Sequence, residues 1–186
     1  MRILLLALLF PFYLYGAAGI YFGGGVSGGT ETFTVENPGV ESREMDTKYI
    51  SGLVKAGYGD LKSYAIEVVL GYGEYDANIY SPNDDTYIYF DISIIKSFDF
   101  DIGFYPFIKA GFGANTFSVE RETKNWLTGG SLIFGGGIYV PIVHGIEVEF
   151  NVIYRDKSWQ EIDMVGAKTK SSSYIVEPYF GINYRF

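Results

Sequence analysis

The stretch Tyr174–Phe186 reads YIVEPYFGINYRF, and its alternation of side chains decides the fold. Counted back from the last residue, every second position is large and apolar: Phe186, Tyr184, Ile182 and Phe180. The opposite parity carries the polar residues Glu177, Asn183 and Arg185. Because successive side chains of a strand point to opposite faces, this pattern predicts a strand with one apolar and one polar face that continues to Phe186.

The first eighteen residues have the features of an export signal. Arg2 supplies a positive charge, residues 3–15 form an apolar run, and small residues follow up to Ala18. We therefore predict a signal peptide at residues 1–18, cleaved after Ala18, and one domain at residues 19–186. A retained membrane anchor is disfavoured because a spanning helix needs about 20 apolar residues.

The composition excludes several classes of protein. The chain is 48% hydrophobic and 18% aromatic, yet no second apolar run of spanning-helix length follows the signal, so its apolar residues are dispersed by alternation. The absence of cysteine excludes disulfides and thiolate metal sites. A net charge of -8 argues against a nucleic-acid partner, which requires a basic surface.

Alternating segments predict eight strands. They cover residues 19–28, 48–57, 62–75, 86–96, 102–117, 127–140 and 146–159, with a last strand that closes the chain after a loop at 160–170. The first, third, fifth and seventh connections are long and polar, whereas the others are short. Outer-membrane barrels have short periplasmic turns and longer external loops. We thus predict an all-β, eight-stranded antiparallel up-and-down transmembrane β-barrel in the bacterial outer membrane, with both termini in the periplasm.

The two faces of the predicted strands differ sharply. In the strand at 146–159, one parity carries Ile146, Val148, Phe150, Val152 and Tyr154, and the other carries Glu147, Glu149, Asn151 and Arg155. We expect the apolar face to meet lipid, because an apolar band of this size would aggregate in water. The alternative is a soluble, lipocalin-type barrel with its apolar face inward, which the many glycines of the polar face disfavour.

Aromatic side chains are expected at the two membrane interfaces, where amphipathic rings are favoured. This reasoning predicts that Tyr72, Tyr154 and Trp159 face outward at the external interface. It places Tyr184 and Phe186 at the periplasmic interface.

Charged residues on the polar parity form the candidate site. Those predicted to face the lumen are Lys55, Glu67, Asp91, Lys109, Glu147, Glu149, Arg155, Glu177 and Arg185. Side chains can just fill an eight-stranded barrel, and buried charges must be paired. The residues are compatible with a lumen packed by ion pairs, and also with a narrow gated pore in which Lys109 or an arginine switches between acidic partners.

The sequence resembles the eight-stranded outer-membrane barrels of the outer membrane protein A transmembrane-domain type and the related small porin-like surface proteins. The resemblance is carried by the signal at 1–18, by eight strands with alternating connections, and by the ending Phe180, Ile182, Tyr184 and Phe186. It implies that the terminal aromatic Phe186 is recognised by the barrel-assembly machinery. It also implies a monomer surrounded by outer-membrane lipid and lipopolysaccharide.

Two enzyme-like motifs occur in the first strand. Residues 23–28 match a dinucleotide fingerprint and residues 25–29 match a GxSxG elbow, but both motifs require a helix after the strand. The only histidine, His144, is predicted at the opposite end of the barrel from Ser27. We predict no catalytic residue, and neither a cofactor nor a metal site, although Asp84 and Asp85 form an acidic pair in a predicted loop.

Three functional hypotheses follow from these patterns. The first is a structural or surface-interaction barrel with long acidic external loops and a charge-filled lumen. The second is a narrow passive pore for ions or small solutes. The third is a lipid-modifying enzyme at the outer rim, which would lose activity on Ser27→Ala.

Overall fold

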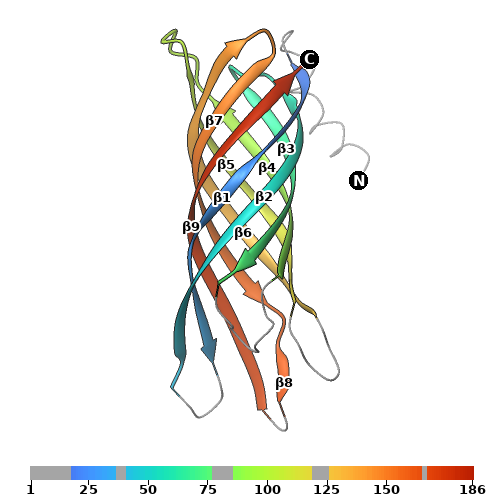
Figure 1. Ribbon diagram of the computed structural model, residues 1–186, viewed down its shortest axis with the longest axis vertical. Coiled ribbons are helices and arrows are strands. Elements are labelled where there is room, and N and C mark those ends of the chain that lie inside the picture. Colours follow the sequence, from blue (N-terminus) through green and yellow to red (C-terminus); the bar gives the residue numbers. More distant parts are fainter. Residues whose placement is uncertain (1–17, 37–40, 77–85, 119–125, 165–166) are drawn as a thin grey trace, which may run out of the picture.

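The computed structural model describes residues 18–36, 41–76, 86–118, 126–164 and 167–186 (Figure 1). Residues 1–17 of the predicted signal peptide, and the acidic pair Asp84 and Asp85, lie outside this part of the chain. None of the described residues forms a helix that is long and apolar enough to cross a membrane.

The described chain is built of strands. They are β1 (Gly19–Glu36), β2 (Arg43–Gly59), β3 (Tyr64–Tyr75), β4 (Thr86–Ser97), β5 (Tyr105–Ser118), β6 (Trp126–Val143), β7 (Ile146–Trp159), β8 (Ile162–Met164) and β9 (Ala167–Arg185). Strands β1 to β7 pair antiparallel in chain order, and β9 pairs with both β7 and β1. Eight strands therefore close a barrel wall, as predicted, and β8 forms a short hairpin with the far end of β9 (Figure 1).

The stagger of the strands sets the width of the barrel. This stagger can be measured by stepping from each residue to its paired residue on the next strand, once around the wall. The path starts at Ser97 on β4, passes through Phe107, Gly137, Asn151, Tyr179, Ser27, Ser51 and Gly73, and ends at Tyr87 on β4. The path returns to β4 ten residues before its start, since 97 minus 87 is 10. With eight strands and this offset the strands tilt strongly, and the bore is narrow enough for side chains to fill.

The first two strands are longer than predicted. β1 continues to Glu36 instead of ending at 28, and β2 begins at Arg43 instead of 48. The added residues pair in an unbroken register from Thr30 with Lys48 to Val35 with Arg43. The sequence concealed this extension because both parities are polar there, so the alternation of hydrophobicity is weak. The predicted loop at 160–170 likewise contains β8 and the start of β9.

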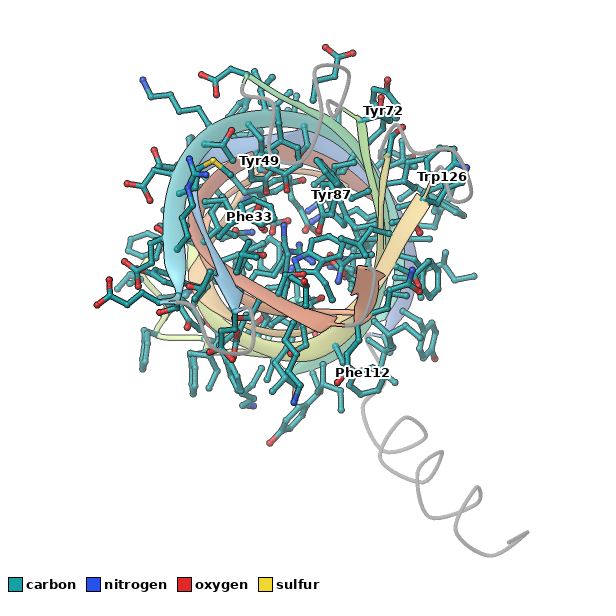
Figure 2. All side chains as sticks on the ribbon, turned by 90° about the horizontal axis from the view of Figure 1, so that it is seen from below. Phe33, Tyr49, Tyr72, Tyr87, Phe112 and Trp126 are labelled. Atoms are coloured by element: carbon teal, nitrogen blue, oxygen red, sulfur yellow. The ribbon has the colours of Figure 1, made fainter. Side chains whose placement is uncertain are left out.

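The outer wall is apolar and the interior is polar and aromatic. Outward side chains of β3, β4 and β7 include Leu70, Tyr72, Phe90, Ile94, Phe150 and Val152, all exposed. Figure 2 shows Tyr72, Phe112 and Trp126 outside the barrel, whereas Phe33, Tyr49 and Tyr87 point into it. The facing predicted for β3, β4 and β7 is therefore confirmed, and the soluble alternative with an inward apolar face is wrong.

Candidate functional site

The lumen holds all nine charged residues that the sequence analysis assigned to it. Eight are buried, and Arg185 is partly buried near one end of the barrel: Lys55, Glu67, Asp91, Lys109, Glu147, Glu149, Arg155, Glu177 and Arg185. The strands place them there because each shares the parity of small or polar residues that face inward. They form separate groups along the barrel axis.

One group is centred on Glu67. Its carboxylate pairs with the ammonium groups of Lys109 at 2.9 Å and Lys55 at 3.0 Å. It also accepts a hydrogen bond from the Tyr21 hydroxyl at 3.0 Å. Lys55 bridges this carboxylate to that of Glu149, with which it also pairs. Strands β1, β2, β3, β5 and β7 are thereby joined across the lumen.

A second group is organised by Arg155. Its guanidinium donates two hydrogen bonds to Asp91, at 2.8 and 2.9 Å, and two to Glu177, at 3.0 and 3.2 Å. The guanidinium also lies 4.6 Å from the centre of the Tyr89 ring. Glu177 accepts a further hydrogen bond from Tyr49. Paired donors of this kind hold a planar carboxylate in a fixed orientation.

Two further ion pairs lie at the ends of the lumen. Arg185 donates to Glu147 at 2.6 Å and to the backbone oxygen of Gly59 at 2.8 Å, close to the short turns. Near the long connections, Lys157 pairs with Glu31 at 2.7 Å, and both side chains are fully buried. This pair was not predicted from the sequence. Lys157 could have been found from its parity with Arg155, but Glu31 fell in a segment predicted to be loop.

Aromatic layers close the lumen at both ends. The layer near the long connections packs around Lys157 and consists of Phe33, Tyr49, Tyr75, Tyr87, Tyr89, Phe117 and Trp159 with Val69, Leu127 and Ile175. We call it the outer aromatic layer. The layer near the short turns consists of Tyr21, Ala65, Ile95, Phe107 and Tyr139. We call it the inner aromatic layer, and the space between the two layers holds the groups of Glu67 and Arg155.

Little free space remains between these layers. The residual cavity among the charged groups measures about 20 Å³, which is room for about one water molecule. Each of the five lumen cations, Lys55, Lys109, Arg155, Lys157 and Arg185, lies within an ion pair. The described lumen is thus a packed interior in which each of these cations has a carboxylate partner, and Arg155 has two, Asp91 and Glu177.

The enzyme-like motifs lie in an unsuitable context. Residues 23–29 sit within β1, which continues as strand to Glu36, so the helix that both motifs require does not follow. Ser27 is buried; its hydroxyl lies 2.8 Å from that of Ser51 and donates to Glu177 at 3.4 Å. His144 lies exposed in the turn between β6 and β7. Within the described ranges, no cluster of carboxylates and histidines is arranged to hold a metal ion.

The prediction that Trp159 faces outward at the membrane interface is wrong. Trp159 is buried in the outer aromatic layer, where its indole nitrogen donates to Ser173 at 3.0 Å. Its parity with the inward residues Arg155 and Lys157 places it inside. Tyr72 and Tyr154 are exposed on the outer wall, as predicted. At the other end, Tyr184 and Phe186 are also exposed, and their rings meet edge to face at 4.8 Å.

The four residues of the predicted assembly signal share the outer face at the end of the chain. Phe180, Ile182 and Tyr184 project from β9, Phe186 follows directly, and all four side chains are exposed. Phe22 of β1 contacts Phe186 edge to face at 6.0 Å. This corner is therefore a continuous apolar surface formed by the first and last strands.

A surface ion pair joins two of the short turns. Lys62, between β2 and β3, pairs with Asp99, between β4 and β5, at 2.9 Å. The hydrogen bond to Asp99 raises the pKa of Lys62 above its ordinary value. The same hydrogen bond lowers the pKa of Asp99. Both side chains lie in solvent-accessible turns, so the pair adds little stability.

Comparison with solved structures identifies the fold. Neisserial surface protein A is 19% identical, with 91% of this chain and 99% of that chain covered and a TM-score of 0.56. The outer membrane protein OprG from Pseudomonas aeruginosa is 14% identical, with coverages of 91% and 96% and a TM-score of 0.54. The outer membrane protein AlkL, solved in lipid bilayers, is 11% identical, with coverages of 91% and 91% and a TM-score of 0.57. No family model matches the sequence, and no curated protein matches it. The chain therefore has the fold of the eight-stranded outer-membrane β-barrels.

Proposed function

We propose that this chain is an integral protein of the bacterial outer membrane with a closed lumen. It stabilises the envelope and acts through its outer wall and external loops, and it does not conduct solutes. The observation that carries this proposal is the packed lumen, in which two aromatic layers enclose the paired charges.

The outer wall supports the membrane location. Large apolar side chains are exposed on every wall strand; those of β1, β2, β5, β6 and β9 include Phe22, Val54, Phe112, Phe134 and Phe180. The wall closes on itself through the pairing of β1 with β9, which is interrupted only at residues 28–30 of the described chain. Lipid can cover such a surface, and a closed barrel satisfies the backbone hydrogen bonds that hydrocarbon cannot.

The energetics of the lumen support the absence of conduction. Taking charges out of water costs several kcal/mol per ion, which only well-placed partners repay, and each cation in the described part of the lumen has such a partner. A permeating ion would have to displace these pairs and also part the tightly packed outer aromatic layer. Resting conduction would therefore require a second arrangement of many buried side chains.

The proposed orientation of the barrel in the membrane follows the usual rule for such barrels. The short turns and both chain ends are assigned to the periplasm, and the long connections to the cell exterior. The exposed row Phe180, Ile182, Tyr184 and Phe186 is the proposed signal for the assembly machinery. Outer-membrane lipid and lipopolysaccharide surround the wall of a monomer. We propose no enzymatic activity, because Ser27 is buried and bonded to Ser51 and Glu177.

Planar-bilayer conductance tests the closed lumen directly. Protein purified from membranes, with folding checked by its heat-dependent gel mobility, is compared with a Lys109→Ala variant. The proposal predicts no steady current from either protein, because the aromatic layers remain when Lys109 is removed. A steady wild-type current that changes with Lys109→Ala would overturn it and establish a pore.

A further inference from the structure

The described part of the lumen holds one more carboxylate than cations. Its five cations are Lys55, Lys109, Arg155, Lys157 and Arg185, and its six carboxylates are Glu31, Glu67, Asp91, Glu147, Glu149 and Glu177. An uncompensated negative charge is costly away from water. A further positive charge is therefore needed to neutralise these groups.

The surplus carboxylate belongs to the group of Arg155. In the group of Glu67, two carboxylates face two lysines, and each pair at the ends of the lumen joins one carboxylate to one cation. Arg155 instead faces two carboxylates, Asp91 and Glu177, and both of these side chains are buried. The unbalanced charge therefore has a defined place in the lumen.

The two carboxylates bonded to Arg155 differ in the groups that face their oxygens. Both oxygens of Asp91 accept from guanidinium nitrogens, at 2.8 and 2.9 Å. Glu177 offers only Oε1 to the guanidinium, at 3.0 and 3.2 Å, whereas its Oε2 faces the hydroxyl of Ser27, at 3.4 Å, and that of Tyr49. A hydroxyl oxygen accepts a hydrogen bond from a protonated carboxyl, and a guanidinium cannot. Of the two, only Glu177 has an oxygen suited to carry a proton.

We propose that the group of Arg155 is a proton-binding site of the folded barrel, with one proton carried on Glu177 Oε2 and donated to a facing hydroxyl. The accepting hydroxyl can turn its own hydrogen to a further acceptor. The Ser27 oxygen lies 2.8 Å from that of Ser51, which lies 3.4 Å from that of Tyr89. The proton thus neutralises the surplus carboxylate and leaves a connected row of hydroxyls. This site goes beyond the proposed function of the barrel.

The surroundings of Glu177 favour a proton over another cation. Each buried lysine of the described lumen pairs with a different glutamate. A metal ion beside Glu177 would be repelled by the guanidinium of Arg155, and among the described residues no cluster of carboxylates and histidines is placed to hold one. The titratable side chains around Glu177 are Glu31 on β1, Tyr49 and Lys55 on β2, Glu67 on β3, Tyr89 and Asp91 on β4, Lys109 on β5, Glu149, Arg155 and Lys157 on β7, and Tyr179 on β9.

Infrared spectroscopy of the barrel folded in lipid vesicles at neutral pH tests the site, because the carbonyl stretch of a protonated carboxyl is separate from the bands of carboxylates. We expect one such band in the wild type, shifted when the protein contains isotope-labelled glutamate and lost in Glu177→Gln. The control Glu161→Gln changes an exposed glutamate and should keep the band. Absence of the band from the folded wild type, its retention in Glu177→Gln, or a shift with labelled aspartate instead of glutamate overturns the proposal.

Urea unfolding at several pH values supplies a second readout. Because the unfolded chain holds this carboxyl ionised at neutral pH, folding takes up a proton. As pH rises towards neutral, the folding equilibrium constant of the wild type should therefore fall by about tenfold per pH unit relative to that of Glu177→Gln. At neutral pH, Glu177→Gln should not lower the urea midpoint, whereas the matched control Glu149→Gln should, since Glu149 is an equally buried carboxylate paired with Lys55.

Two results of the unfolding experiment would contradict the proton site. One is a midpoint lowered as far by Glu177→Gln as by Glu149→Gln. The other is a wild-type midpoint that rises with sodium at constant ionic strength while that of Glu177→Gln does not, which would assign the site to a metal ion.

Failure of the proton site and failure of the proposed function are distinguishable. A folded barrel that is silent in the conductance experiment but lacks the protonated carboxyl refutes only the proton site. A conducting barrel that keeps the band refutes only the closed lumen.

Discussion

Lys157 of β7 and Glu31 of β1 form an ion pair at 2.7 Å in the middle of the outer aromatic layer. Tyr75 donates to the same carboxylate oxygen at 2.7 Å, and the Lys157 ammonium lies 4.0 Å from the centre of the Tyr87 ring. The residues are 126 positions apart in sequence. A charge pair therefore holds together the layer that closes the lumen near the long connections.

Removing one partner of this ion pair should destabilise the barrel strongly, whereas replacing both partners with apolar residues should not. Glu31→Gln or Lys157→Met alone leaves a buried charge or acceptor unpaired and should lower the free energy of unfolding by about 3–5 kcal/mol. The double variant Glu31→Leu with Lys157→Met should recover most of this loss. Urea unfolding in lipid vesicles measures these differences.

The exposed pair of Lys170 and Glu161 supplies the control for that series. Lys170→Met should change stability by about 0–1 kcal/mol, because solvent screens exposed ion pairs. If Lys157→Met were as mild as Lys170→Met, the ion pair would not stabilise the outer aromatic layer.

Two neighbouring glycines should respond in opposite ways to alanine. A side-chain carbon at Gly71 would collide with the inward ring of Tyr89, whereas one at Gly52 would meet open space on the outer wall. Gly71→Ala should destabilise the barrel by about 1–3 kcal/mol through overpacking. Gly52→Ala should be neutral or stabilise it by up to about 1 kcal/mol, because glycine weakens a strand interior. Thermal or urea unfolding midpoints compare the two, and a milder effect at Gly71 would contradict the packing described.

The fluorescence of the two tryptophans should report on opposite sides of the barrel wall. Trp126 is 48% exposed on the outer wall, and Trp159 is 6% exposed in the outer aromatic layer. A brominated lipid should therefore quench the fluorescence of a Trp159→Phe variant, which retains Trp126 on the outer wall, whereas acrylamide in the water should leave a Trp126→Phe variant, which retains Trp159, nearly unaffected. Strong acrylamide quenching of Trp159 in folded protein would show that water enters the lumen at the end near the long connections, and would count against a closed lumen.

The turn pair of Lys62 and Asp99 should be visible in a pH titration. The raised pKa of Lys62 means that its contribution is complete below the ordinary lysine pKa and is lost as pH rises through the folded value. The lowered pKa of Asp99 means that its contribution is present above the ordinary aspartate pKa and is lost as pH falls through the folded value. Asp99→Asn should bring the Lys62 titration, followed by side-chain NMR, back towards that of free lysine. An unchanged Lys62 titration would contradict the interaction.

The fold could be predicted from sequence where the two faces of a strand differ strongly. The bounds of β7, Ile146–Trp159, were predicted without error, because its large apolar residues and its charges separate cleanly by parity. The ends of β1 and β2 at their long connection, residues 29–36 and 43–47, were missed because polar residues occupy both faces there. The inward aromatic Phe33 remained as a signal, but a single residue does not establish a strand.

The inward facing of the lumen charges was predictable, but their partners were not. Charges avoid the middle of the apolar face, and this alone assigns Lys55 and Glu149 to the interior. Their contact depends on the ten-residue offset of the closed wall, which brings together residues 94 positions apart. That offset is a property of all the strand pairings together. Trp159 was misplaced for a related reason, since an indole suits an interface as well as a packed interior.

The ion pairs and hydrogen bonds across the lumen also affect how the barrel folds and closes. Lys157 with Glu31 joins β7 to β1, Lys55 with Glu149 joins β2 to β7, and Tyr49 with Glu177 joins β2 to β9. In an open sheet the first and last strands are far apart, so these partners have not yet met. A slip by one residue at the β1–β9 seam would turn the charges of β9 towards lipid. Closure in the native register therefore completes these particular pairs, and an incorrectly closed intermediate lacks them, which favours its reopening.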